Sequence, residues 1–364
     1  MVYKVIGMMS GSSLDGLDLA FVHFQEIAGK WNFELVKTAH YPFETSWKSK
    51  LERAHKLNAY DYLHLHSAFG HFLGRRVNEF IESNDLQFQV QLIVSHGHTV
   101  FHSPGKFMTA QLGEGASIAA ETGINTVTDL RAMDVALGGQ GAPIVPIGEL
   151  LLFGLHKFYL NLGGIANLSC SLGENFVAFD ICPANRILNL LAANVGLEYD
   201  DGGKIASSGR INQGLLGQLN LLEYYGDRYP KSLDNRFGTD VVYPLIRESG
   251  LDTADAMRTY VEHIVIQIMK QVAFLTASLN SDGESLLVTG GGAHNTFLMR
   301  RLEEELMPFG ICVVVPDRQV VDFKEALIMA FIGVLRWREE ANTIASVTGA
   351  KKGSIGGALW IGQA

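Results

Sequence analysis

The residues best suited to bind an anionic ligand lie in three turns rich in glycine. The first turn runs from Gly7 to Gly16 between two apolar stretches and reads GMMSGSSLDG. Small residues let backbone N–H groups approach a phosphate closely, Ser12 and Ser13 add hydroxyl donors, and Asp15 could hold a magnesium ion directly or through water. A hairpin turn that needs glycine only for its conformation is the alternative. No Gly-Lys-Ser/Thr follows, which excludes a Walker-type loop.

The second and third turns lie midway along the chain and near its C-terminal third. The second, Asn161–Asn167, joins two apolar stretches through Gly163 and Gly164. The third, Thr289–Asn295, leads from an apolar stretch into a helical pattern. Its glycines are Gly290, Gly291 and Gly292. The start of a helix carries partial positive charge, so a turn of this kind suits the phosphates and sugar of a nucleotide.

One aspartate is placed to act as a general base. Asp180 follows the apolar run Phe176–Phe179, and carboxylates at the ends of strands face the crevice where open α/β sheets bind ligands. A base must lie within hydrogen-bond reach of the proton that it takes. A helix cap or turn aspartate is the alternative. The competing carboxylates are Asp129, Asp134 and Glu325.

The segment DLRAMD places two acids and a base, Asp129, Arg131 and Asp134, within six residues. It predicts either a clamp for sugar hydroxyls or a surface cluster of ion pairs. The sequence alone leaves both open.

Alternating histidines occur in SHGHTVFH, where His96, His98 and His102 could share one face of a strand and bind zinc. No cysteine cluster or HExxH motif accompanies them, so a metal site is not expected there. Gly97 after His96 indicates another turn that lines a cleft.

Strand patterns precede helical patterns in both halves of the chain, which predicts two α/β lobes in tandem. The expected strands are Lys4–Met9, Asp18–Phe24, Phe33–Tyr41, Val90–Val94, Asn125–Thr128, Tyr159–Leu162, Ala166–Ser169, Phe176–Phe179, Ser285–Thr289 and Cys312–Val315. The expected helices are Tyr60–Glu82, Ile118–Glu121, Thr253–Leu279, Phe297–Leu306 and Lys324–Arg338. The glycines of GGQGAP indicate the switch between lobes, with one lobe formed by 1–134 and about 340–364 and the other by 135–339.

The composition narrows the function classes. The 364 residues are 47% apolar and 18% charged, which suffices for two buried cores. The net charge of −9 argues against a nucleic-acid or anionic-membrane partner. No 18-residue apolar run or signal-peptide pattern occurs, and Cys170, Cys182 and Cys312 form no CxxC pair. We therefore expect a soluble cytoplasmic protein.

Several segments together resemble the anhydro-N-acetylmuramic acid kinases over nearly the whole chain. They are GMMSGSSLDGLD (7–18), SHGHTVFHSP (95–104), QLGEG (111–115), DLRAMDVALGGQGAPIVP (129–146), LNLGGIANLS (160–169), VTGGGAHNTFLMRRL (288–302), DFKEAL (322–327) and SVTGAKKGSIG (346–356). The order of the three glycine turns also resembles that of the two phosphate motifs and the adenosine motif of the actin, Hsp70 and sugar-kinase superfamily.

The resemblance implies a two-lobed, actin-like (ribonuclease H-like) α/β fold with ATP in an interlobe cleft, Mg²⁺ as a cofactor and a homodimer. The family reaction opens the 1,6-anhydro bond of the sugar with water and phosphorylates O6. The products are N-acetylmuramic acid 6-phosphate and ADP, in the recycling of cell-wall fragments.

Residue roles follow from the same resemblance. Asp180 matches the base that activates water for attack at C1, and Asp15 is the candidate for Mg²⁺. The residues implied for ATP are Gly11, Ser12, Ser13, Leu14, Asp15, Gly16, Leu17, Asp18, Gly163, Gly164, Asn167, Gly290, Gly291, Gly292 and Asn295. Those implied for the sugar are His96, Gln111, Arg131, Asp134 and Glu325.

The chain departs from the family pattern beside the base. Where FDTGPGN and an acid are usual, it has FDICPANRILN, and His98 stands where glutamine is usual. The changed positions are Ile181, Cys182, Ala184 and Asn189. A kinase for another amino sugar or polyol, or a nucleotide-binding sugar sensor without turnover, are the alternatives.

Overall fold

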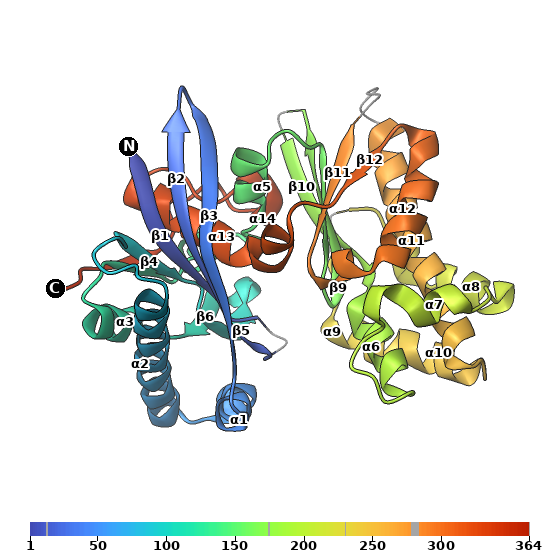
Figure 1. The fold of residues 1–364 in the computed structure, drawn as a ribbon, viewed down its shortest axis with the longest axis horizontal. Helices are drawn as coiled ribbons and strands as arrows, with labels where there is room; N and C mark the ends of the chain where they lie inside the picture. The colour runs from blue at the N-terminus through green and yellow to red at the C-terminus, as the bar shows by residue number, and fades with distance from the viewer. Residues whose placement is uncertain (12–13, 174, 230, 278–283, 364) are drawn as a thin grey trace. The chain divides into compact units, whose positions relative to one another are not determined.

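A computed structural model describes residues 1–11, 14–173, 175–229, 231–277 and 284–363. The chain forms two compact units, each with its own sheet (Figure 1). Unit 1 comprises Met1–Gly154 and Phe323–Ala364, and unit 2 comprises Leu155–Asp322. The bounds of the units thus fall at 154/155 and 322/323, whereas the sequence suggested 134/135 and about 339/340.

The sheet of unit 1 has six strands in the order β13-β7-β4-β1-β2-β3. The strands are β1 (Val2–Met9), β2 (Gly16–Ile27), β3 (Lys30–Pro42), β4 (Leu92–Ser95), β7 (Thr126–Thr128) and β13 (Ala358–Trp360). The first three form an antiparallel meander, and β4 and β7 continue the sheet in parallel from β1.

The sheet of unit 2 has five strands in the order β10-β9-β8-β11-β12. The strands are β8 (Phe158–Leu162), β9 (Ile165–Leu172), β10 (Asn175–Pro183), β11 (Ser285–Thr289) and β12 (Cys312–Val314). Again the first three are antiparallel and the last two are parallel. Both units therefore share the strand order third, second, first, fourth, fifth. This repeated order confirms the predicted two-lobed, ribonuclease H-like fold class.

The helices bury one apolar face against these sheets. The helices of unit 1 are α1 (Thr45–Arg53), α2 (Ala59–Ser83), α3 (Gly115–Thr122), α4 (Ala132–Ala136), α5 (Pro146–Leu152) and α14 (Ala345–Thr348). Those of unit 2 are α6 (Asn185–Ala193), α7 (Lys204–Ser208), α8 (Gln213–Asn220), α9 (Asn235–Phe237), α10 (Tyr243–Glu248), α11 (Thr253–Ala277) and α12 (Thr296–Leu306). Helix α13 (Arg318–Trp337) crosses the bound between the units. None of the helices in the described part of the chain could span a membrane.

Helix α2 shows why the sequence forms these elements. Apolar residues recur at intervals of three or four, so they lie on one face and pack with β1 and β2. The side chain of Asn58 caps the helix by accepting a hydrogen bond from the Asp61 backbone N–H at 3.0 Å. The helix predicted over Tyr60–Glu82 is thereby confirmed.

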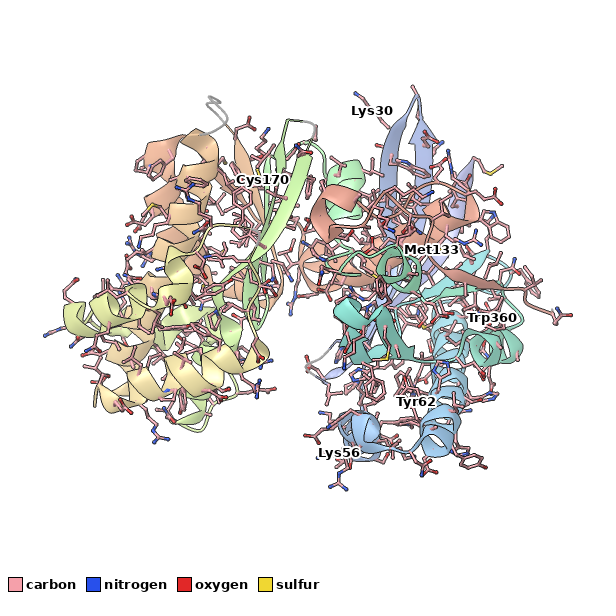
Figure 2. The ribbon with its side chains drawn as sticks, turned by 180° about the vertical axis from the view of Figure 1, so that it is seen from behind. Lys30, Lys56, Tyr62, Met133, Cys170 and Trp360 are labelled. Atoms are coloured by element: carbon pink, nitrogen blue, oxygen red, sulfur yellow. The ribbon has the colours of Figure 1, made fainter. Side chains whose placement is uncertain are left out.

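The C-terminal strand belongs to unit 1 through its tryptophan. The indole N–H of Trp360, labelled in Figure 2, donates to the Thr128 hydroxyl at 3.2 Å. Its ring lies against Gly115, where a Cβ atom would come within 2.3 Å of the ring. This contact anchors β13 at the edge of the sheet.

The expected strands and helices are found, and helices such as α1 and α5 are present in addition. The last two residues of the helix expected over Thr253–Leu279 lie outside the described residues. Three further differences bear on the site. The hairpin of β5 (His98–Ser103) and β6 (Met108–Leu112) was not predicted, because it is short and its burial does not alternate. Helix α13 begins at Arg318 rather than Lys324. Strand β10 runs on to Pro183, so the prediction that Asp180 ends its strand was wrong; a β-bulge between Asp180 and Cys182 lets pairing with β9 continue.

Candidate functional site

The second glycine turn, between β8 and β9, also begins helix α6. The carbonyl groups of Gly163 and Gly164 accept hydrogen bonds from the backbone N–H groups of Asn185 at 3.1 Å and Ala184 at 2.8 Å. The Asn185 side chain donates to the Leu162 carbonyl at 2.9 Å. N–H groups at the start of a helix need such partners, so the turn and α6 hold each other in place.

The third glycine turn, between β11 and α12, packs on the second. Gly290 has φ +81°, and a Cβ atom there would lie 2.6 Å from the side-chain oxygen of Asn161. A Cβ atom on Gly292 would lie 2.7 Å from that of Leu162. The fold itself therefore requires glycine at 290 and 292.

Three other glycines have no such packing reason. A Cβ atom on Gly163, Gly164 or Gly291 would meet nothing closer than 3.6, 3.8 and 3.7 Å. Small residues at positions that the fold leaves open are typical of backbone that approaches a ligand closely. This fits a nucleotide, and the nucleotide contacts of these residues stay a prediction.

Asn295 has a structural task at the third turn. Its side chain caps α12 by accepting a hydrogen bond from the Leu298 N–H at 3.0 Å. A fourth glycine turn, which sequence reasoning missed, packs beside it. A Cβ atom on Gly203 would meet the side chain of Asn295 at 2.3 Å, and the Thr296 hydroxyl donates to the Gly202 carbonyl at 3.1 Å. The sequence DDGG at 200–203 was the available signal.

Asp180 lies half-buried on β10, opposite Asn167 of β9. It does not cap α6, because the cap position is Ala184. Its carboxylate accepts hydrogen bonds from the Asn167 side chain, from the Leu233 N–H at 2.8 Å and from the Ser232 hydroxyl at 3.2 Å. The structure thus brings together Asn167 and Asp180, which the sequence assigned to different roles, and adds 232–233, which it did not identify.

The residues that depart from the family pattern lie mostly in the core of unit 2. Ile181, Cys182 and Ala184 are at most 1% exposed. Burial raises the pKa of the Cys182 thiol well above its usual range, so it stays protonated. The side chains of these three residues therefore pack into the core, while Asn189 is exposed on α6.

The first glycine turn joins β1 to β2 in unit 1. Gly16 is required by packing, because a Cβ atom there would lie 2.4 Å from the Tyr41 carbonyl oxygen, and Leu17 is buried in the core. Asp15 is exposed, and its carbonyl accepts from the Phe43 N–H at 3.0 Å. Asp18 accepts a hydrogen bond from the His40 ring at 2.7 Å.

The remaining described residues of this turn, within 11–18, are Gly11 and Leu14. Leu14 has a left-handed φ of 60°, and its N–H lies 3.4 Å from the Gly11 carbonyl oxygen. Ser12 and Ser13 lie outside the described residues.

Arg131 and His96, both predicted to bind the sugar, are joined to each other by a hydrogen bond. Burial lowers the pKa of His96 to about 3, so the ring is neutral. Its Nδ1–H therefore donates to the Gly97 carbonyl at 2.9 Å, and its Nε2 accepts from Arg131 Nε at 2.8 Å. Arg131 also donates to the Gly141 carbonyl at 2.5 Å. Burial lowers the pKa of Arg131 to about 10, which leaves it cationic near neutral pH.

The other predicted sugar ligands differ in accessibility. Asp134 is fully buried, and its two oxygens accept from the Thr348 hydroxyl at 2.7 Å and the Gly141 N–H at 2.8 Å. Gln111 is buried and donates to the Thr109 hydroxyl at 2.9 Å. Burial raises the pKa of Glu325, which the charges of Lys324 and Arg131 partly oppose. Both oxygens of Asp134 therefore stabilise the fold of unit 1 by hydrogen bonds to other residues.

The alternating histidines have separate partners. His98 pairs with the Ser10 hydroxyl at 3.2 Å, and His102 pairs with the Thr109 hydroxyl at 3.1 Å. Over the described ranges, no group of three or more His, Cys, Asp or Glu side chains is arranged to hold a metal ion.

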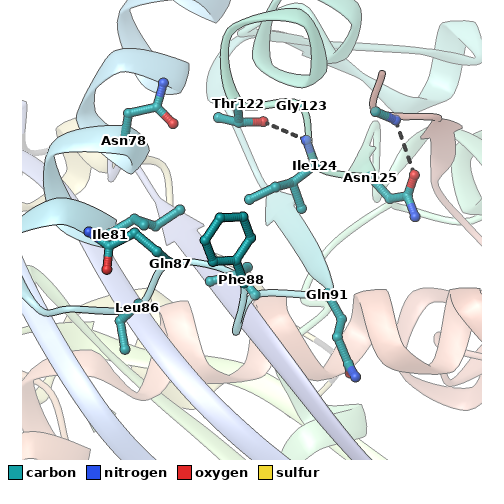
Figure 3. Close-up of a pocket in the computed structure, with 12 residues that line it drawn as sticks. Asn78, Ile81, Leu86, Gln87, Phe88, Gln91, Thr122, Gly123, Ile124 and Asn125 are labelled. Carbon is teal, nitrogen blue, oxygen red and sulfur yellow. Dashed lines mark hydrogen bonds between the residues drawn. The ribbon is translucent and has the colours of Figure 1, made fainter. Parts of the chain in front are cut away.

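A surface cavity of about 490 Å³ lies elsewhere in unit 1 (Figure 3). It is lined by residues from the end of α2, the 86–91 loop, 122–125 and Gly362. Its polar groups are partly engaged, since Asn125 accepts from the Gly362 N–H at 3.1 Å. None of the predicted site residues lines it, so the cavity is separate from the candidate site.

Comparison with known proteins gives one consistent family. The sequence model described as "Anhydro-N-acetylmuramic acid kinase" matches residues 3–362. Proteins of that name from Aliivibrio fischeri, Coxiella burnetii and Haemophilus influenzae are 34%, 32% and 31% identical to this chain. The alignments cover 96%, 99% and 98% of this chain and 96%, 98% and 97% of the relatives.

A solved structure of the activator of 2-hydroxyisocaproyl-CoA dehydratase from Clostridium difficile aligns with 93% of this chain and 97% of its own. Its TM-score is 0.44 at 13% identity, a level from which no conclusion follows. The family match and the relatives, by contrast, cover essentially the whole chain. The chain belongs to the anhydro-N-acetylmuramic acid kinase family.

Proposed function

We propose that this protein uses ATP to phosphorylate anhydro-N-acetylmuramic acid, opening its 1,6-anhydro ring with water. The products are N-acetylmuramic acid 6-phosphate and ADP, a step in the recycling of cell-wall peptidoglycan. The main observation behind the proposal is that hydrogen bonds fix the carboxylate of Asp180 on the strand beside the second glycine turn. Full-length membership of the family supports the choice of sugar.

Asp180 is the proposed general base. It takes a proton from a water molecule, whose oxygen forms a bond to C1 of the sugar while the bond between C1 and O6 breaks. The freed O6 takes the γ-phosphoryl group, the bond from phosphorus to the bridging oxygen breaks, and ADP leaves. The proton on Asp180 returns to solvent. Catalysis then rests mainly on positioning and on stabilisation of charge.

The nucleotide is assigned to the glycine turns. The backbone at Gly163, Gly164 and Gly291 has room for close approach, because no packing fills the Cβ positions there. In unit 1, the 11–18 turn is the second proposed phosphate contact. Mg²⁺ would neutralise phosphate charge, with the exposed carboxylate of Asp15 holding it directly or through water.

The sugar is assigned to residues of unit 1. Arg131 remains cationic: its hydrogen-bond partners, His96 and the Gly141 carbonyl, are neutral, and the charges of Glu325 and Asp134 favour its charged form. We assign it to the carboxylate of a muramic acid, which its planar guanidinium suits. Glu325 and Gln111 are the proposed partners for sugar hydroxyl and amide groups. Asp134 is proposed to act through the loop that it holds rather than by contact.

The assembly and the compartment are also proposals. A homodimer is what the resemblance implies, and the cysteines, which form no CxxC pair, fit a reducing compartment such as the cytoplasm. Size-exclusion chromatography with light scattering would show whether the protein is dimeric.

Incubation with ATP, Mg²⁺ and anhydro-N-acetylmuramic acid, followed by mass spectrometry, tests the function. We expect a product heavier than the substrate by one water and one phosphoryl group. A product that gains only the phosphoryl group, or no product, would contradict the proposal. Parallel reactions with N-acetylglucosamine and with simple polyols test the alternative sugar substrates.

A further inference from the structure

We propose that Oδ1 of Asp180 is the atom that accepts the proton, and that Asn167, Tyr224 and Ser232 are positioning residues for it. This inference rests on the proposed role of Asp180 as the base. It names the groups that fix the geometry of that base. Two of them, Tyr224 and Ser232, lie on a loop of unit 2 described over 224–229 and 231–233, which carries no recognisable sequence motif.

The backbone of Asp180 is held on both sides by this loop. The Tyr224 hydroxyl donates to the Asp180 carbonyl at 2.7 Å, and the Asp180 N–H donates to the Lys231 carbonyl at 3.2 Å. These bonds lie next to the β-bulge that follows Asp180. A bulge redirects a side chain, so the loop fixes the direction in which the carboxylate points.

The two carboxylate oxygens are held unequally. Oδ2 accepts two hydrogen bonds, from the Leu233 N–H at 2.8 Å and from the Ser232 hydroxyl at 3.2 Å. Within the described part of the chain, Oδ1 accepts one, from the Asn167 side-chain amide. An ionised carboxylate offers about four acceptor sites over its two oxygens. Oδ2 is therefore saturated, and Oδ1 retains an acceptor site for the proton of a water molecule.

Contacts within the loop that carries Tyr224 and Ser232 stabilise its position beside Asp180. The ammonium group of Lys231 donates to the Tyr224 carbonyl at 3.2 Å and lies 4.4 Å from the centre of the Tyr224 ring. Burial raises the pKa of Tyr224 far above the physiological range, so its hydroxyl keeps its proton and remains a donor. On the other side of the bulge, the Tyr260 hydroxyl donates to the Pro183 carbonyl at 2.7 Å.

This arrangement gives Asn167 a role different from the nucleotide contact that the sequence suggested. Its amide nitrogen faces Asp180 across the paired strands. A substitution there should change the turnover number more than the KM for ATP. A nucleotide contact should do the opposite.

Steady-state kinetics of the full-length protein test the inference. We expect kcat to fall about 100-fold in Asn167→Ala and about tenfold in Tyr224→Phe and Ser232→Ala, because small displacements of a reacting group cost up to about 100-fold. The KM for ATP should stay within about twofold, and Ser232→Thr should restore most of the kcat lost in Ser232→Ala. Tyr225→Phe is the matched control, because the Tyr225 hydroxyl, next along the chain from Tyr224, is buried and has no hydrogen-bond partner among the described residues.

Amide hydrogen exchange gives a second readout that needs no substrate. In Asp180→Ala the Leu233 N–H loses its acceptor, so its exchange should accelerate at least about tenfold. The amide of Leu287, in the core strand β11, should exchange as in the wild type.

The outcomes separate this inference from the proposed function. If the wild type turns over the sugar and Asp180→Asn does not, but the three positioning variants keep the wild-type kcat, the positioning roles are wrong and the function stands. A rise in the KM for ATP alone in Asn167→Ala would return Asn167 to the nucleotide site. If the wild type does not turn over the sugar, the proposed function is wrong. Unchanged amide exchange at Leu233 in Asp180→Ala would then also contradict the hydrogen bonds proposed to hold the Asp180 carboxylate.

Discussion

The two units carry a polar pair at the same place in the same topology, but the carboxylate lies on the second strand in unit 1 and on the third strand in unit 2. In unit 1, Gly16 pairs with Pro42 and Asp18 with His40 across β2 and β3. In unit 2, Ile165 pairs with Pro183 and Asn167 with Asp180 across β9 and β10, with one bulged residue between. Each pair thus begins two residues into the second strand, directly after a glycine turn.

The surroundings of the two pairs differ in kind. The side chains of His40 and Asp18 lie 2.7 Å apart and are 42% and 34% exposed, so water reaches both of them. Asp180 instead accepts hydrogen bonds from Asn167, Ser232 and Leu233, while Tyr224 holds its backbone. The comparison teaches that the repeated fold places a polar pair at this point, whereas in unit 2 the loop packed against the pair supplies the further hydrogen bonds that hold the carboxylate.

The largest effect should come from Asp180. We predict that Asp180→Asn lowers kcat by about 10²–10⁴-fold, because an amide cannot take the proton of water. Binding of an ATP analogue, measured by calorimetry, should remain. Asp18→Asn, which removes the carboxylate of the corresponding pair in unit 1, is the comparison variant and should mainly raise the KM for ATP. A kcat above about one tenth of wild type in Asp180→Asn would make Asp180 a structural residue.

The next largest effects should come from replacing one glycine in each unit, Gly291 in unit 2 and Gly16 in unit 1. Gly291→Val should weaken binding of a non-hydrolysable ATP analogue at least about tenfold, while the protein stays folded, because a Cβ atom has room there. Gly16→Val in unit 1 should instead lose about 1–3 kcal/mol or more of stability, because its Cβ atom would overlap the Tyr41 carbonyl. Calorimetry and thermal unfolding of both variants check this. Unchanged affinity in a folded Gly291→Val would remove that turn from the nucleotide site.

Acid should destabilise both units alike. Burial lowers the pKa values of His96 in unit 1 and His263 in unit 2 to about 3. The unfolded chain therefore binds more protons than the folded one between about pH 6.5 and 3, and stability falls as pH falls through that window. From pH 7 to pH 5 we expect each histidine to cost about 2 kcal/mol.

Denaturant unfolding at the two pH values measures this loss. The variants His96→Gln and His263→Gln should each show a smaller difference between pH 7 and pH 5 than the wild type. An unchanged difference in either variant would mean that the corresponding histidine is already protonated, or free to be, in the folded protein.

Thiol reactivity should show the smallest effect. Cys170 and Cys182 are buried in unit 2, and burial raises the pKa of the Cys170 thiol to about 12 and that of Cys182 further, so neither supplies a thiolate near neutral pH. Cys312 is exposed. Titration of the folded protein with a disulfide reagent should modify Cys312 rapidly and the other two only on unfolding. Rapid modification of Cys182 would show that the corner beside Asp180 opens.

The sequence predicted the parts of this fold that follow from local periodicity. The helical stripe of α2, the apolar strands and the three glycine turns could all be read from residue spacing. The β5–β6 hairpin could not, since its strands are short and lack alternation. The bulge after Asp180 depends on pairing with β9, which is a property of two strands and not of one segment.

The site was predictable to a similar extent. The types and order of Asp180, Arg131 and the glycines indicated their chemistry. The partners of Asp180 could not be foreseen, because Tyr224, Ser232 and Leu233 lie more than 40 residues away in a loop without periodicity. Nor does the sequence show that Asp134 is fully buried, with both oxygens bonded within unit 1.

Reaction in H₂¹⁸O tests the central claim most directly, that a base-activated water opens the sugar ring before O6 is phosphorylated. The account predicts one labelled oxygen at C1 of the phosphorylated sugar made by the wild type, and no labelled product from Asp180→Asn. A phosphorylated product without label would contradict it, because the phosphoryl group would then have passed to a hydroxyl already present on a different sugar.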